Sequence, residues 1–152
     1  MPCRWPELLV LAALTSTPAT AQQASEIGVE AVGTFSDPGL IVGAGYAALR
    51  VGTRTRVSLG LGAGSAEGDW VGRGELLGHF LLSPEHERKP GFYLAGGIAG
   101  VTGAVDRGYI VLTAGVEKGP AGSSGWALEA GIGGGVRLAA GYRWRFWKKP
   151  GH

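Results

Sequence analysis

The sequence predicts an all-β fold, an eight-stranded antiparallel up-and-down transmembrane β-barrel, and three observations lead to it. Apolar and polar residues alternate with a period of two in segments of about ten residues, as membrane-crossing strands do. Breaks rich in Gly, Pro, Ser and Asp separate the segments and suit hairpins between antiparallel neighbours. Glycine is abundant, with 29 residues in a chain of 152, and many glycines lie inside apolar stretches such as Gly60–Gly62.

The predicted strands follow one another as a repeated hairpin unit. No helical pattern with a period of 3.6 competes with the period of two, and no crossover helix separates two segments, which argues against a parallel sheet. Glycine packs no side chain and is typical of tightly bent strands, so its abundance favours a small, strongly curved barrel. The strands are expected at residues 26–35, 39–51, 54–64, 70–82, 91–102, 108–118, 126–133 and 136–147.

The first residues of the chain have the pattern of a secretory signal peptide. Arg4 supplies a positive charge, residues 8–14 (LLVLAAL) form a short apolar core, and residues 19–21 (ATA) form an A-x-A cleavage site. The apolar core is far shorter than the ~20 residues that a membrane-spanning helix needs. We therefore expect cleavage after Ala21, which leaves residues 22–152 as a single barrel domain.

Each clearly alternating segment has one apolar face and one face of charged or very small residues. In the last segment Tyr142, Trp144 and Phe146 share one face, whereas Arg143 and Arg145 share the other. Successive side chains of a strand point to opposite faces. The interior of an eight-stranded barrel is just wide enough for side chains to fill, and the many bulky apolar residues would overfill it. We therefore predict that the charged face lines the lumen and that the apolar face meets lipid.

The predicted lumen carries acidic and basic residues in equal numbers. A buried charge without a partner is strongly destabilising, so these side chains should form ion pairs. We expect Arg143 and Arg145 to pair with glutamates of the first and seventh strands. Such a network serves either as a plug or as a narrow ion path or proton relay, and the small interior favours the plug. The predicted network is Glu26, Glu30, Arg56, Arg73, Glu75, His79, Glu117, Glu129, Arg137, Arg143 and Arg145.

Aromatic residues near the ends of the segments are typical of the interfacial girdles of membrane β-barrels. The alternative is that these rings pack in an ordinary soluble core. We assign Tyr109 to the girdle, together with the predicted lipid-facing residues Trp70, Phe80, Trp126, Tyr142, Trp144, Phe146 and Trp147.

Candidate catalytic residues are few. His79 lies on the lumen face, but no Ser, His and Asp arrangement of a hydrolase is evident. Ser123 and Ser124 lie in a Gly-rich turn and His86 in a charged turn, which favours neither catalysis nor metal binding. No segment matches a phosphate-binding loop, and a dispersed net charge of +2 does not indicate nucleic acid. We therefore expect no enzymatic activity, cofactor, metal or nucleic-acid partner.

Two segments carry a resemblance to a known family. Residues 90–97 (PGFYLAGG) look like the P-x-Y-x-G-x-G start of a central strand, and residues 141–147 (GYRWRFW) look like an aromatic-ended final strand. With these segments as its best local matches, the whole mature chain resembles the small eight-stranded outer-membrane barrels, the class of the OmpA transmembrane domain and the OmpX-like proteins. The resemblance implies a Gram-negative-type outer membrane and insertion by the barrel-assembly machinery. Five residues follow the aromatic end here, and the long external loops of that family are missing.

We expect an outer-membrane protein with a structural, anchoring or interaction role, a plugged lumen, surrounding outer-membrane lipid and a monomeric state. Three alternatives stay open: a soluble lipocalin-like barrel that binds an apolar ligand, a narrow pore, and a lipid A-modifying enzyme. An even number of strands predicts both mature termini on the periplasmic side. The breaks at 52–53, 83–91 and 119–125 are then periplasmic, and the other four are external.

Overall fold

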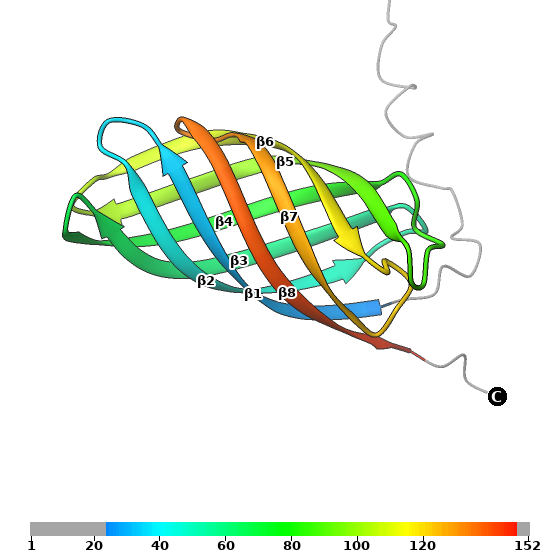
Figure 1. Ribbon diagram of the computed structural model, residues 1–152. Helices are drawn as coiled ribbons and strands as arrows, with labels where there is room; N and C mark the ends of the chain where they lie inside the picture. Colours follow the sequence, from blue (N-terminus) through cyan, green and yellow to red (C-terminus); the bar gives the residue numbers. More distant parts are fainter. Residues whose placement is uncertain (1–23, 149–152) are drawn as a thin grey trace, which may run out of the picture.

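Eight strands follow one another along the chain in the computed structural model, which describes residues 24–148 (Figure 1). β1 also pairs with β8, from Ala24 opposite Trp147 to Phe35 opposite Val136, and this pairing closes the sheet. The predicted eight-stranded antiparallel up-and-down barrel is confirmed, with strand limits within two residues of those expected. The strands are β1 (Ala24–Phe35), β2 (Leu40–Arg50), β3 (Thr55–Ala66), β4 (Asp69–Leu81), β5 (Pro90–Gly103), β6 (Arg107–Lys118), β7 (Ser124–Ile132) and β8 (Val136–Trp147).

Two further findings bear on how the chain would meet a membrane. The predicted signal peptide, residues 1–21, lies outside the described residues. Within residues 24–148, no helix is long and apolar enough to span a membrane.

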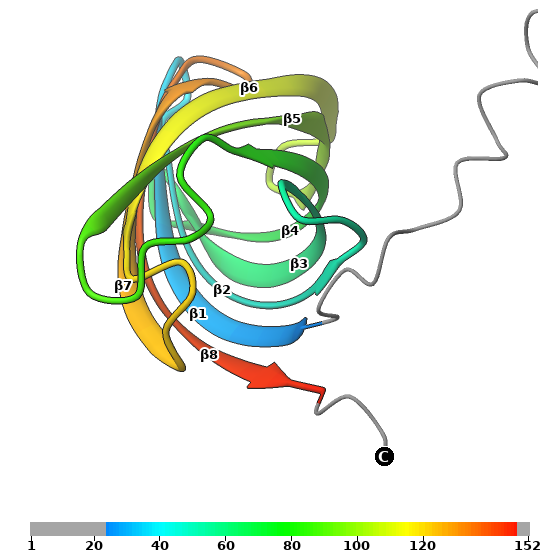
Figure 2. The same cartoon turned by 90° about the vertical axis from the view of Figure 1, so that its right-hand side faces the viewer.

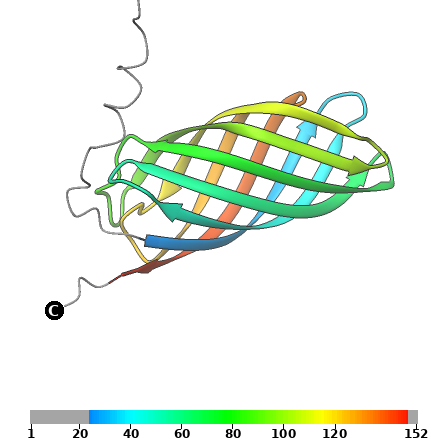
Figure 3. The same ribbon diagram turned by 180° about the vertical axis from the view of Figure 1, so that it is seen from behind.

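The two ends of the barrel differ in their connections. At the terminal end β1 begins, β8 ends, and the loops 51–54, 82–89 and 119–123 join neighbouring strands. Figure 2 looks onto this end and shows its loops around the opening. Figures 1 and 3 show the opposite end, where the connections have at most four residues. We call that end the turn end; its connections are residues 36–39, 67–68, 104–106 and 133–135.

The connection between β3 and β4 shows how local sequence sets these tight turns. Ala66 pairs with Asp69, so only Glu67 and Gly68 lie between the strands. Both have positive φ, 50° and 98°, which is the backbone that a two-residue type I′ hairpin requires. The amide of Gly68 also donates a hydrogen bond to the Ser65 hydroxyl at 3.0 Å. The glycine at the second position is therefore a requirement of the turn.

Side chains alternate between the interior and the exterior of the barrel, and the charged ones lie inside. On β3, Leu59 is 55% exposed, whereas its neighbour Ser58 is 8% exposed and Arg56 is 1% exposed. Because the sheet is closed, every strand has one inner and one outer face. This distribution is the reverse of that in water-soluble proteins, where arginine and glutamate are rarely buried.

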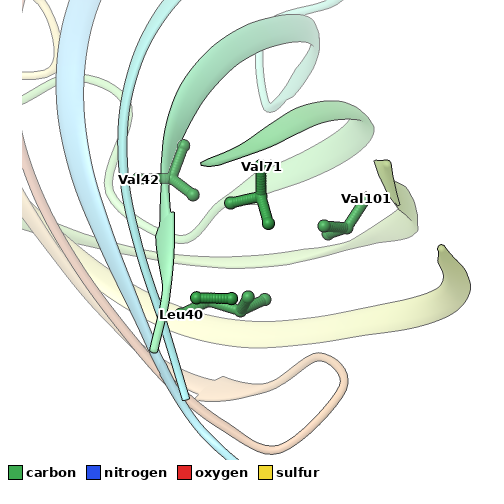
Figure 4. Packing of buried hydrophobic residues seen from close by; sticks show 5 residues of the cluster. Leu40, Val42, Val71 and Val101 are labelled. Carbon is green, nitrogen blue, oxygen red and sulfur yellow. The ribbon is translucent and has the colours of Figure 1, made fainter. Parts of the chain in front are cut away.

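The lumen next to the turn end is filled by apolar side chains. Leu40 and Val42 of β2, Val71 of β4 and Val101 of β5 point toward one another in the interior (Figure 4). A second layer, made of Leu77, Ala99 and Val111, lies against them through the ring of Tyr109. This apolar packing closes the barrel at the turn end.

Inward-facing glycines make room for two tyrosine rings. Tyr93 pairs with Gly115 on the neighbouring strand, and a Cβ added at Gly115 would overlap the Tyr93 ring. Tyr46 and Gly28 repeat this arrangement between β1 and β2. A small interior can hold both aromatic rings and long charged side chains only where neighbouring positions carry no side chain.

Candidate functional site

The charged part of the lumen is the candidate site because it gathers the titratable residues of the interior. Ten of the eleven residues that the sequence analysis assigns to the lumen are buried, and Glu30 is half-buried. The ion pairs of these residues, which also include Arg50, form two groups. The terminal cluster contains Glu26, Arg50, Arg56, Glu117, Arg143 and Arg145, and the middle cluster contains Arg73, Glu75, Glu129 and Arg137.

Glu117 is the centre of the terminal cluster. Its Oε2 lies 2.8 Å from Arg143 Nη1 and 2.6 Å from Arg145 Nη2, both on β8. The same oxygen lies 3.2 Å from Arg56 Nη1, which reaches it from β3. Neither β3 nor β8 is a neighbour of β6 in the barrel, so these ion pairs cross the lumen.

Glu26 is the second carboxylate of the terminal cluster. Its Oε1 lies 3.3 Å from Arg50 Nε, and its Oε2 lies 3.2 Å from Arg56 Nη1. With four guanidinium groups and two carboxylates, the cluster has an excess of two positive charges. The excess must be balanced by other acceptors, because a buried charge that lacks partners is costly.

The loop between β6 and β7 supplies some of these acceptors. Arg145 Nη1 donates to the carbonyl oxygen of Gly119 at 3.0 Å and to that of Gly122 at 3.3 Å. Arg50 Nη2 donates to the carbonyl oxygen of Pro120, and the side chain of Pro120 is fully buried. The loop therefore turns these carbonyl oxygens toward the arginines of the terminal cluster.

The middle cluster is a chain of charge-assisted hydrogen bonds. Arg137 donates to Glu129 Oε2 at 2.5 Å and to Glu75 Oε1 at 3.0 Å. Arg73 donates to Glu75 Oε2 through Nη2 at 2.8 Å. The Tyr93 hydroxyl completes the chain by donating to Glu129 Oε1 at 2.7 Å. These bonds join side chains from β4, β5, β7 and β8 across the interior.

A small cavity remains between the two clusters. Glu30, Tyr46 and Arg143 are among the residues that line it, and its free volume is about 20 Å³. The Tyr46 hydroxyl and Arg143 Nε are buried without a protein partner. The cavity has room for about one water molecule, which would serve both groups. This cavity therefore has no space for a larger ligand.

His79 and Ser58 are in contact, but not in the arrangement of a catalytic pair. Ser58 Oγ lies 2.8 Å from His79 Nε2, and Arg56 Nη2 lies 3.3 Å from His79 Nδ1. A guanidinium group only donates, so Nδ1 accepts and the ring proton is on Nε2. Nε2 then donates to Ser58 and cannot remove its proton, which is the role of the base in hydrolases. The pair is structural.

Most of the predicted lipid-facing residues are exposed on the outer face, and two aromatic residues depart from the expectation. Trp147 is on the inner face of β8, and its ring centroid lies 5.0 Å from Arg50 Cζ. Tyr109 also points inward, and its hydroxyl accepts a hydrogen bond from Arg73 at 2.6 Å. The side-chain alternation explains both departures: Trp147 is in phase with Arg145, and Tyr109 is in phase with Val111, which is buried. The predicted outer residues that are exposed are Trp70, Phe80, Trp126, Tyr142, Trp144 and Phe146.

The expected pairing of the last strand is correct only in part. Arg143 and Arg145 do approach Glu26 on β1, at 3.7 and 3.5 Å. Their closest carboxylate is Glu117, however, which the expectation left out because β6 is not a neighbour of β8. Glu129 pairs with Arg137 instead, and among the described residues no ion pair includes Glu30.

Sequence reasoning missed Arg50, Tyr46 and Tyr93 as lumen residues. All three are on strands whose middle part contains mostly Gly and Ala, where the alternation of apolar and polar residues is weak. The alternation of side chains along β2 could have identified two of them. Tyr46 and Arg50 are four positions apart in this strand, so both lie on the same face, which is the inner one.

The remaining candidate groups have ordinary local partners. His86 Nδ1 lies 3.0 Å from the carbonyl oxygen of Pro90, and Ser124 Oγ lies 3.0 Å from the Tyr142 hydroxyl. Across residues 24–148 no three His, Cys, Asp or Glu side chains gather as a metal site.

A solved structure with the same architecture is the N-terminal β-barrel domain of OprF from Pseudomonas aeruginosa. It matches with a TM-score of 0.65 and 12% sequence identity, over 84% of this chain and 100% of that one. This chain shares the OprF barrel fold. The resemblance to OmpA-like barrels is thereby confirmed at the level of the fold. Neither protein-family models nor curated sequences give a match.

Proposed function

We propose that this chain is an outer-membrane β-barrel with a structural or anchoring role and a lumen closed by its own side chains. The observation that carries the proposal is the inverted distribution of side chains. Large apolar residues are exposed on all eight strands, while buried charges gather inside. Soluble monomers rarely expose apolar patches beyond a few hundred Å². A closed barrel leaves no unpaired strand edge and is one of only two folds that span a lipid bilayer.

Three layers in the lumen support an anchoring role rather than a channel. Apolar packing around Val42 and Val71 closes the turn end. Ion pairs around Glu75 and Glu117 cross the middle. The loop that contains Pro120 accepts hydrogen bonds from Arg50 and Arg145 at the terminal end. A hydrated ion would have to displace all three layers in order to pass.

The geometry does not favour the other two alternatives. A drug-sized apolar ligand needs a pocket of about 300–1,000 Å³, whereas the lumen cavity is about 20 Å³ and is lined by charged side chains. A lipocalin-like function would also require the apolar face to point inward. Lipid-modifying catalysis lacks an activated nucleophile, because His79 donates to Ser58 instead of accepting from it.

Outer-membrane lipid, insertion by the barrel-assembly machinery, a monomeric state and cleavage after Ala21 belong to the same proposal. The test is fractionation of Gram-negative cells that express the full chain, followed by gel electrophoresis with and without boiling. We expect an outer-membrane band whose mobility changes on boiling, a mature N-terminus at Gln22, and no steady single-channel current in planar bilayers. Recovery in the soluble periplasmic fraction would overturn the membrane placement, and large steady currents would overturn the closed lumen.

A further inference from the structure

Basic residues surround the terminal end at the strand boundaries. Arg54 immediately precedes β3, Lys89 immediately precedes β5, Lys118 is the last residue of β6, and Lys148 directly follows β8. All four side chains are exposed. We call this set the basic rim. Its members lie beside each of the three loops at this end and directly after the last strand, so the positive charge is spread around the whole circumference.

The acidic residues at the terminal end are placed differently. Glu85 and Glu87 are exposed in the middle of the loop 82–89, away from either strand boundary. Arg88 is exposed beside them, so this loop is not acidic in sum. At the strand boundaries of the terminal end the exposed charges are therefore all positive.

The turn end has the opposite charge. Four acidic residues, Asp37, Glu67, Asp69 and Asp106, are exposed there, against a single base, Arg107. The terminal cluster lies just inside the basic rim. Its excess of two positive charges therefore increases the difference in charge between the two ends of the barrel. The barrel is consequently polarised along its axis, positive at the terminal end and negative at the turn end.

In a membrane-spanning barrel, residues at strand boundaries lie at the depth of the lipid headgroups. Lysine and arginine place their aliphatic stems along the apolar surface and their charges among the headgroups. Trp126 and Trp144 are exposed near the same end, where aromatic side chains mark the interface. The basic rim is therefore positioned to meet lipid phosphates.

We propose that the basic rim binds the headgroups of anionic glycerophospholipids in the leaflet at the terminal end. This proposal rests on the proposed membrane placement. Each Lys or Arg near an anionic membrane surface increases the affinity of a protein for that surface about fivefold. The interaction is electrostatic and should weaken as salt is raised, because exposed charges are screened. The arginines of the terminal cluster take no direct part, because their side chains are buried inside the barrel.

The test uses the mature chain reconstituted in nanodiscs of equal parts phosphatidylglycerol and phosphatidylcholine. Native mass spectrometry measures which lipids stay bound when the protein is released. We expect retention of phosphatidylglycerol by wild type and at least about a tenfold loss when Arg54, Lys89, Lys118 and Lys148 are all changed to Gln. Lys118→Gln and Arg107→Gln form a matched pair, since each removes one exposed base, at opposite ends. Only Lys118→Gln should reduce retention.

The outcomes separate this inference from the proposed function. A wild-type chain that does not insert into the bilayer, and shows no mobility change on boiling, overturns both. A chain that inserts but retains the two lipids equally overturns the lipid inference alone. Equal losses for Lys118→Gln and Arg107→Gln also overturn it, because they would show a general effect of net charge rather than binding at the basic rim.

Discussion

Arg137 on β8 donates a hydrogen bond to Glu75 on β4 at 3.0 Å, although these two strands lie on different sides of the barrel. The other amino group of Arg137 donates to Glu129, so one guanidinium group joins two carboxylates. Arg137 is fully buried. Ion pairs of this kind connect the walls of the barrel through its interior, where strand pairing alone does not reach.

Glu75→Gln should be strongly destabilising. The substitution keeps the shape of the side chain but removes the negative charge that faces Arg73 and Arg137. Breaking a buried ion pair by neutralising one partner costs about 3–5 kcal/mol. Urea titration of the reconstituted barrel, followed by gel mobility, measures this loss in the free energy of unfolding.

The double variant Arg73→Met with Glu75→Gln should recover part of that loss. It leaves Arg137 and Glu129 as a balanced pair and replaces the unpaired guanidinium with an apolar side chain. Glu85→Gln is the control, since Glu85 is exposed and should change stability by no more than about 0.5 kcal/mol. A double variant that is less stable than Glu75→Gln would count against charge balance as the cause.

Glu117→Gln and Glu30→Gln should differ widely in stability. Glu117 faces Arg56, Arg143 and Arg145, and without its charge only Glu26 remains to balance the terminal cluster. A loss of about 3–5 kcal/mol is expected. Glu30 has no ion pair among the described residues, and its cavity is lined by Arg143 as well as by Glu75 and Glu129. Removing its charge breaks no ion pair and relieves repulsion from two carboxylates, so Glu30→Gln should be neutral or stabilising.

The same unfolding titration compares the two variants at equal protein and lipid concentrations. Equal losses at both positions would mean that Glu30 has a cationic partner in the lumen, which would contradict the ion pairs of the structure. A structural control is Glu87→Gln, which is exposed at the terminal end. It should leave the midpoint of unfolding within experimental error.

The sequence predicted the barrel and its two faces but not the identity of most ion pairs. Alternation along β8 places Arg143 and Arg145 inside, because side-chain direction depends only on position along the strand. Their preference for Glu117 over Glu129 depends on the width of the lumen and on which side chains reach across it. That information is absent from strand order. Trp147 illustrates a second limit, since its aromatic character suggested the lipid face while its position in the strand placed it beside Arg50.

Leu59→Arg should be costly if the outer face meets lipid. Leu59 is 55% exposed in the middle of β3, between Ala47 and Leu76 on the neighbouring strands. An arginine at the bilayer midplane costs about 2–4 kcal/mol, whereas one near the interface costs about 0–1 kcal/mol. Leu82→Arg, just beyond β4, is the matched control and should cost less. Equal tolerance of both substitutions, measured by unfolding in lipid, would contradict a bilayer around β3.

Gly115→Ala should destabilise the barrel through steric overlap. The added Cβ would overlap the ring of Tyr93, which is 1% exposed and hydrogen-bonded to Glu129. Overpacking of this kind costs on the order of 1–3 kcal/mol. Gly43→Ala is the control, because a Cβ there meets no atom within 4 Å. If both substitutions have the same small effect on unfolding, the fit between Tyr93 and Gly115 is not a determinant of stability.

The orientation of the barrel is the last prediction, and the loops make it unusual. Outer-membrane barrels generally have short periplasmic turns and longer external loops. Here the longest loop, 82–89, is at the same end as the first and last strand ends, and the opposite end has only tight turns. If both mature termini are periplasmic, as an even number of strands predicts, the cell surface meets a nearly loopless, acidic turn end.

Cysteine labelling in intact cells decides between the two orientations. Glu67→Cys places a thiol in the turn between β3 and β4, and Ser123→Cys places one in the loop between β6 and β7; both positions are exposed. With periplasmic termini, a membrane-impermeant maleimide should label position 67 in whole cells and label position 123 only after the outer membrane is permeabilised. Labelling of position 123 in whole cells, with position 67 protected, would reverse the orientation. The basic rim would then face the external leaflet, and the anionic lipids it meets would be those of the cell surface.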